Sequence, residues 1–163
     1  MALTTVPSSM IQQMSAANMP TGSVIQTVTA TSTTNNTTSG GTYADTGLTV
    51  SITPTSATSK IMVLISATVG CSGYNAGQNG VANFQIVRGS TSIYVTAIAT
   101  YNYTGAGSGG VSSVTPSILS YIDSPATTSS TTYKLQYKNT SGSSAYFNTD
   151  SGHSTITLME IKQ

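Results

Sequence analysis

The segment from Gly47 to Gly70, GLTVSITPTSATSKIMVLISATVG, constrains the possible folds more than any other part of the chain. In its first half, Leu48, Val50 and Ile52 alternate with hydroxyl-bearing residues, which is the period-two pattern of a strand with one packed face. Pro54 has no N–H to donate to a neighbouring strand, so we expect this strand to end before it.

The second half of the segment contains five consecutive apolar residues, Ile61 to Ile65. This run is too short to span a membrane and is rich in β-branched side chains, so it predicts a strand buried on both faces. A half-buried strand followed by a fully buried one requires two packed layers of sheet.

From Gly22 onward the alternation of apolar and polar residues continues, and no helical pattern follows residue 21. We therefore expect one all-β domain over residues 22–163, an antiparallel jelly-roll sandwich of about eight strands. Pro116 is expected to mark a bulge or the start of a strand. The expected strands are 23–31, 48–53, 61–65, 81–88, 92–100, 118–122, 131–138 and 154–162.

Few charges accompany this pattern. Charged residues make up 6% of the 163 residues, against about 25% in an average soluble protein. The net charge of +1 comes from scattered cations, so nothing resembles a nucleic-acid-binding surface. A chain with so little self-repulsion is suited to assembly into a larger body.

Residues 1–21 differ from the rest of the chain. Met10, Ile11 and Met14 can share one side of a short helix that ends before Pro20. A helix this short needs a surface to lie on. The segment is either a frayed terminus or, as we favour, an arm that orders against a neighbouring subunit or a host surface, and whether it is helical or extended stays open.

The residues that could carry catalysis are scarce. Asp150, His153 and Ser154 are close in sequence, but neighbours in one glycine-containing turn rarely form a triad, and we expect a solvated turn. One histidine and one cysteine, Cys71, lack the spacing of a metal site. Cys71 is expected to be a small buried side chain. We therefore predict no enzyme, cofactor site or metal site.

Glu160 is the unusual carboxylate. It lies an even number of residues from Ile156 and Leu158 in the same expected strand, so its side chain should point toward the packed face with theirs. It either reaches water near the strand end or needs a partner such as Lys60 or Arg88, since a buried unpaired carboxylate is unfavourable.

Two glycine-rich loops combine aromatic and amide side chains. Tyr74 and Asn75 lie in one loop, and Tyr101 and Tyr103 lie in the other. Such a composition suits contact with a sugar or another protein, although ordinary polar loops have a similar composition.

Several phrases of the sequence resemble a known family: GLTVSITPTSATSKIMVLISATVG, FQIVRGSTSIY, SPATTSSTTYKLQY and STITLMEIKQ. The chain from Gly22 to Gln163 is similar to small virion-surface proteins of tailed bacteriophages. The resemblance implies a homotrimeric jelly roll, like the TNF and complement globular-head domains, with a structural role on tail fibres, fibre tips or the capsid.

The short region before the first strand favours a capsid decoration or cement protein over a complete tail fibre. We expect it at the virion surface, assembled in the bacterial cytoplasm, with the major capsid protein or another virion component as partner and no nucleic acid or membrane. The alternative is a tail-fibre tip or adaptor that binds a host receptor or glycan. A third interpretation, a bacterial surface or matrix protein, is disfavoured because residues 1–14 lack a signal-peptide pattern.

In a trimer, the apolar strand 61–65 could also contact another subunit. One of its covering layers could then be another subunit, so Ile61, Val63 and Ile65 are predicted at or next to the three-fold interface.

Overall fold

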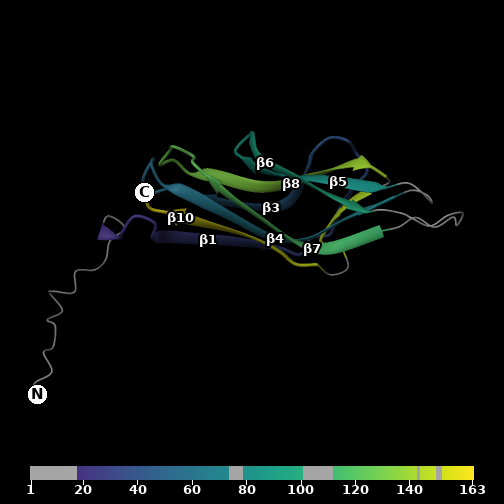
Figure 1. Ribbon diagram of the computed structural model, residues 1–163, viewed down its shortest axis with the longest axis horizontal. Helices are drawn as coiled ribbons and strands as arrows, with labels where there is room; N and C mark the ends of the chain where they lie inside the picture. Colours follow the sequence, from purple (N-terminus) through teal and green to yellow (C-terminus); the bar gives the residue numbers. More distant parts are fainter. Residues whose placement is uncertain (1–17, 74–78, 101–111, 143, 150–151) are drawn as a thin grey trace, which may run out of the picture.

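Ten β-strands form the regular structure of the residues that the computed structural model describes, which are 18–73, 79–100, 112–142, 144–149 and 152–163. Figure 1 shows them stacked in two layers. The strands are β1 (Val24–Ser32), β2 (Asn36–Thr38), β3 (Ala44–Ile52), β4 (Lys60–Ser72), β5 (Gly80–Arg88), β6 (Thr91–Thr100), β7 (Ser112–Asp123), β8 (Thr131–Ser141), β9 (Ser144–Phe147) and β10 (Ser154–Ile161).

The strands pair in a nested order. β1 pairs with β10, β2 with β9, β3 with β8, β4 with β7 and β5 with β6, all antiparallel. The pairing is that of one long hairpin rolled into two sheets, which is the jelly-roll arrangement. One sheet has six strands, β1-β10-β4-β9-β2 with β7 on the other edge of β4, and the second has the order β3-β8-β5-β6. The predicted all-β antiparallel sandwich is confirmed.

β4 is the central strand of the six-stranded sheet and contains the apolar run. Ile61, Val63 and Ile65 point into the sandwich with no exposed surface. Leu64, which lies between them, is 36% exposed, and Met62 is half-buried. The prediction that this run is buried on both faces is therefore wrong for the single chain, because nothing in the described residues covers the outer face of this sheet.

The core lies between the two sheets and follows the alternation of the strands. Each fully buried aliphatic side chain there stabilises the fold by about 1.5–3 kcal/mol. Cys71 is part of this core, as predicted. The six-stranded sheet contributes Ile61, Val63, Ile65, Val69, Phe147, Ile156 and Leu158, and the four-stranded sheet contributes Leu48, Ile52, Phe84, Ile86, Tyr133, Leu135 and Tyr137.

The differences from the predicted strands have simple causes. β2 and β9 were not predicted, because β2 consists of Asn and Thr and β9 has only four residues. β7 begins at Ser112, so Pro116 lies inside the strand opposite Thr68, with no register shift there, and marks neither a bulge nor a strand start. Among the described strands β7 pairs only with β4, and a proline on such an edge removes no ladder hydrogen bond.

Gly142, in the turn between β8 and β9, is expected to tolerate no side chain. It has a φ of +90°, and a Cβ there would lie 2.2 Å from the carbonyl oxygen of Ser72. The backbone would have to move, so Gly142→Ala should destabilise the domain by more than the roughly 1–2 kcal/mol of left-handed strain alone. Each kcal/mol lost should lower the Tm by about 2–4 °C. Calorimetry checks this. Gly41→Ala is the control, since a Cβ at Gly41 has no neighbour within 4 Å, and equal Tm values for the two variants would contradict the close approach.

Candidate interaction surfaces

The sandwich has two distinct ends, separated by the length of β4. At about 3.3 Å per residue, the 13 residues of this strand span roughly 40 Å. The chain enters β1 and leaves β10 at one end, which we call the arm end. β5 and β7 begin at the other end, which we call the loop end, and Figure 1 shows this separation.

The root of the N-terminal segment is tied to the last strand. Lys162 Nζ donates to the carbonyl of Met19 at 2.6 Å, and its backbone N–H donates to the Ser23 carbonyl at 3.0 Å. Gly22 N–H donates to the Lys162 carbonyl at 2.8 Å. These bonds set the point from which the predicted arm departs. Its candidate attachment residues Met10, Ile11 and Met14 lie outside the described residues, and their role stays a prediction.

Glu160 anchors the same end. Its side chain is completely buried, as the alternation along the strand predicted. Its Oε1 accepts the backbone N–H and the hydroxyl of Thr55, each at 2.8 Å, and its Oε2 accepts Nε2 of Gln26 at 2.5 Å. The expectation that a buried Glu160 needs a partner is confirmed, but it does not reach water and its partners are not Lys60 or Arg88, because uncharged donors from two other segments surround it.

These donors decide the charge state of the carboxyl group. Burial by itself would raise the pKa of Glu160, but the hydrogen bonds it accepts outweigh this effect and hold its pKa below the ordinary value of 4.5. Glu160 is therefore a carboxylate at neutral pH, and it joins β1, β10 and the β3–β4 loop.

Asn148 is a structural residue that the sequence interpretation missed. It is 1% exposed and has a φ of 56°, a conformation that asparagine adopts more readily than most residues. Its N–H donates to the Thr68 carbonyl, its Nδ2 donates to the Ser32 carbonyl, and its Oδ1 accepts the Ser154 hydroxyl. No local pattern could have revealed this, because the three partners come from three strands.

The three residues considered for a triad do not form one among the residues described. Ser154 is fully buried, and its hydroxyl also accepts the Thr68 N–H at 3.2 Å. His153 is exposed, and Asp150 lies outside the described residues. The described residues contain no group of three His, Cys, Asp or Glu side chains that could hold a metal. Nor do they include a helix long and apolar enough to cross a bilayer.

The roots of the two tyrosine-containing loops lie side by side at the loop end. Gly80 pairs with Thr100 where the first loop ends and the second begins, and Ser72 pairs with Ser112 on the other sheet. Tyr74, Asn75, Tyr101 and Tyr103 themselves lie outside the described residues. The strand pairing nevertheless brings together the two segments that contain them.

At the arm end, an ion pair joins the sheets. Arg88 Nη1 contacts both carboxylate oxygens of Asp123, at 2.8 and 2.9 Å, and the Ser124 carbonyl at 3.3 Å. The Tyr133 hydroxyl donates to Asp123 Oδ2 at 2.7 Å, and burial together with this carboxylate strongly raises the pKa of Tyr133. Asp123 is 6% exposed, and the three hydrogen bonds that it accepts from Arg88 and Tyr133 compensate its burial.

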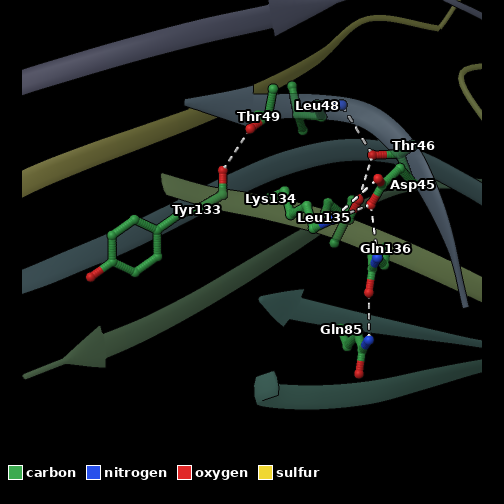
Figure 2. A network of polar contacts seen from close by, with 9 residues as sticks. All are labelled: Asp45, Thr46, Leu48, Thr49, Gln85, Tyr133, Lys134, Leu135 and Gln136. Atoms are coloured by element: carbon green, nitrogen blue, oxygen red, sulfur yellow. Dashed lines mark hydrogen bonds and ion pairs between the residues drawn. The ribbon is translucent and has the colours of Figure 1, made fainter. Parts of the chain in front are cut away.

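A polar network crosses the outer face of the four-stranded sheet (Figure 2). Gln85 donates to Gln136 at 2.7 Å, Gln136 donates to Asp45 at 2.7 Å, and Lys134 Nζ lies 2.8 Å from Asp45 Oδ1. The hydrogen bonds from Lys134 and Gln136 lower the pKa of Asp45. The network connects β3, β8 and β5 and makes this face the hydrophilic one.

A bulge in β3 shapes one edge of this network. Asp45 and Thr49 pair with Gln136 and Lys134, so three residues of β3 oppose Leu135 alone. The Thr46 hydroxyl donates to the Leu135 carbonyl at 2.8 Å, replacing the backbone donor that the bulge removes. Figure 2 shows this side chain turned toward β8.

The outer face of the six-stranded sheet is different in character. Lys60 is the only charged residue that the described register places on it. Ile118 and Ile122 are 76% and 51% exposed, and they flank the outward side chains of Met62 and Leu64. We call these four residues, Met62, Leu64, Ile118 and Ile122, the apolar outer patch.

The residues predicted for a trimer interface lie on the opposite face of the same strand. Ile61, Val63 and Ile65 are wholly covered within one chain, so they cannot themselves contact a second subunit in this conformation. Their strand does contribute Met62 and Leu64 to the apolar outer patch. The trimer itself stays a prediction.

No family model and no curated protein matches the sequence. Among solved structures, the chain is similar to a chain in the structure of infectious bursal disease virus strain Gx, with 13% sequence identity and a TM-score of 0.35. The match covers 85% of this chain and 37% of the viral chain. Arguments about function therefore rest on the residues of this protein.

Replacing Glu160 by glutamine should remove a stabilisation that depends on pH. Because the folded pKa lies below 4.5, the carboxylate stabilises the fold above that pH, and the effect is lost as the pH falls through the folded pKa. At pH 7, Glu160→Gln should destabilise the domain by about 1–3 kcal/mol, since one carboxylate oxygen becomes a donor facing donors.

Thermal unfolding between pH 3 and pH 7 measures this difference, which should shrink toward the acidic end. Asp45→Asn is the control, because the Asp45 side chain is 57% exposed and should matter little. A constant difference between wild type and Glu160→Gln across the pH range would show that the charge of Glu160 is not responsible.

Proposed function

We propose that this protein is a non-enzymatic structural component of a bacteriophage virion, a homotrimeric jelly roll that decorates or cements the capsid through its N-terminal arm. The observation that carries this proposal is that the arm and the tyrosine-containing loops join opposite ends of the domain. Residues 1–17 join at the arm end, where Lys162 binds the segment's root, and the tyrosine-containing loops join about 40 Å away. Such a domain can attach by one end and present the other.

The state of the acidic residues supports a structural role. Asp45, Asp123 and Glu160 are each engaged by structural partners, and the fourth carboxylate, Asp150, lies outside the described residues. An enzyme needs acids, bases or nucleophiles that converge on a substrate. In the described part of the chain, these groups hold strands together instead.

The apolar outer patch supports self-association. Apolar surface of this kind on a soluble protein commonly marks a contact with another protein. Among the described residues, the face that contains it bears no charge except Lys60, so a second copy can approach there without desolvation of ion pairs. We propose that this face contributes to the trimer interface, with Leu64 and Ile118 among its contacts.

Cementing would then follow from multivalency. Three arms on one trimer reach neighbouring shell subunits, and once one arm is bound, the others bind at a high effective concentration. Weak contacts by Met10, Ile11 and Met14 would therefore be sufficient for stable attachment.

Deleting residues 1–19 should abolish attachment to capsid shells, because the remaining domain has no arm. Co-sedimentation of the purified protein with shells measures this. The full-length variant Met10→Ser, Ile11→Ser, Met14→Ser is the matched comparison and should bind at least about tenfold more weakly, since loss of apolar contacts from three arms adds up. Undiminished binding of the deletion variant would exclude the arm as anchor.

The double variant Ile118→Ser, Ile122→Ser should dissociate the trimer, because it makes the apolar outer patch polar. Light scattering should give three times the 16.6 kDa chain mass for wild type and the mass of one chain for the variant. Val95→Ser changes an exposed apolar residue, 53% exposed on the other sheet, and should leave the trimer intact. A wild-type protein that is monomeric at micromolar concentration would contradict the trimer.

A second candidate function is receptor binding at a tail-fibre tip or adaptor, in which the tyrosine-containing loops contact host glycans. The adjacent loop roots at Gly80 and Thr100 favour it, since they join both loops to one rigid platform. Tyr74→Ala with Tyr101→Ala should reduce adsorption to host cells under this function and leave it unchanged if the protein only decorates the capsid.

A further inference from the structure

An open hollow of about 390 Å³ lies at the arm end, between the β5–β6 turn and the β7–β8 loop. This volume corresponds to about a dozen water molecules and falls in the range of small-molecule sites. Among the described residues that line it, Arg88 is the only ionisable one, and hydroxyl side chains and Pro125 form most of the rest. The hollow is separate from the arm root and from the loop roots.

The guanidinium of Arg88 is held in place with donors to spare. Its Nη1 is occupied by Asp123 and the Ser124 carbonyl, which orient the group. Its Nε and Nη2 donate to no atom of the described chain, and the side chain is 28% exposed. A planar guanidinium with free donors suits a carboxylate, which can accept two parallel hydrogen bonds.

The hydroxyl groups of the hollow divide into two sets. Thr127 accepts the Ser129 N–H, Thr131 donates to the Ser129 carbonyl, and both bonds shape the loop. The side-chain hydroxyls of Ser90, Thr91 and Ser130 make no hydrogen bond to the described residues, and these three residues border the hollow from both sides. They can donate to and accept from a ligand that itself has several hydroxyl groups.

The wall of the hollow contains an unfavourable backbone conformation. Ala126 has a φ of 54°, which alanine rarely adopts and which is less favourable by about 1–2 kcal/mol. It stands between Pro125 and Thr127, two lining residues. Strain that the surrounding structure maintains is frequent in ligand-binding segments. On the facing turn, Gly89 N–H donates to the Thr132 carbonyl at 2.8 Å, so that wall is fixed as well.

We propose that this hollow binds a carboxylate-bearing sugar, such as a uronic acid. The carboxylate contacts Nε and Nη2 of Arg88, and the sugar hydroxyls bond to Ser90, Thr91 and Ser130. Pro125 and the threonine methyl groups offer apolar surface to the ring C–H groups. Because Asp123 already compensates the positive charge of Arg88, an inorganic polyanion is disfavoured as the ligand, and a single carboxylate fits best.

NMR titration of the isotope-labelled full chain tests this proposal with D-galacturonate, D-galactose and acetate as probes. Galacturonate should shift the amide signals of Gly89, Ser90, Thr127 and Ser130 and bind about tenfold more tightly than either other probe, because only it satisfies both sets of groups. Its affinity should fall as salt is added. Equal affinity for galactose or acetate, or shifts confined to other parts of the chain, would overturn the proposal.

Two kinds of variant separate binding from folding. Thr91→Val with Ser130→Ala leaves the Asp123 ion pair intact and should weaken galacturonate binding about 5- to 30-fold, as expected for two lost hydrogen bonds. Thr115→Val, which replaces an exposed residue near the loop end of β7, should leave the affinity for galacturonate unchanged. Arg88→Gln, if its spectrum shows a folded chain, should abolish the preference for galacturonate over galactose. Retained preference in that variant would exclude Arg88 as the carboxylate ligand.

Discussion

Continuous antiparallel pairing along β4 is the constraint on which the rest of the structure depends. One edge of this strand pairs with β7 from Ile61 to Ser72, and the other edge pairs first with β10 and then with β9. Because successive side chains point to opposite faces, this register decides which residues enter the core and which form the outer surface. It also places the arm root and the loop roots at opposite ends.

Because the chain has few charged residues, hydroxyl and amide side chains make the contacts between strands that ion pairs often make in other proteins. Thr46 replaces a backbone donor at the β3 bulge, Asn148 joins three strands, and neutral donors hold Glu160 as a carboxylate. Buried polar groups must find partners, and short side chains can do so without charge separation. In the described part of the chain, the outer face of the six-stranded sheet consequently has no ion pair, and Arg88 has unused donors beside a hollow.

Much of the fold could be predicted from local patterns, and much of the candidate sites could not. Alternation, together with the continuous apolar run at 61–65, located eight of the strands, and alternation gave the inward direction of Glu160. β2 has no apolar residue and left no such signal. The partners of Glu160 escaped prediction because Gln26 and Thr55 lie 134 and 105 residues away in sequence. The hollow beside Arg88 is formed by two turns that meet only after both sheets have assembled.

The sequence by itself determined an all-β, two-layered sandwich with little charge, a first core strand that ends before Pro54, and an N-terminal segment unlike the rest. These properties follow from side-chain period and from what proline and charge forbid locally. Only the tertiary structure decided that Ile61, Val63 and Ile65 are covered by their own chain while Leu64 is not. The physical reason is that burial of a strand's second face depends on what packs against the sheet, and the run of apolar letters contains no information about that layer.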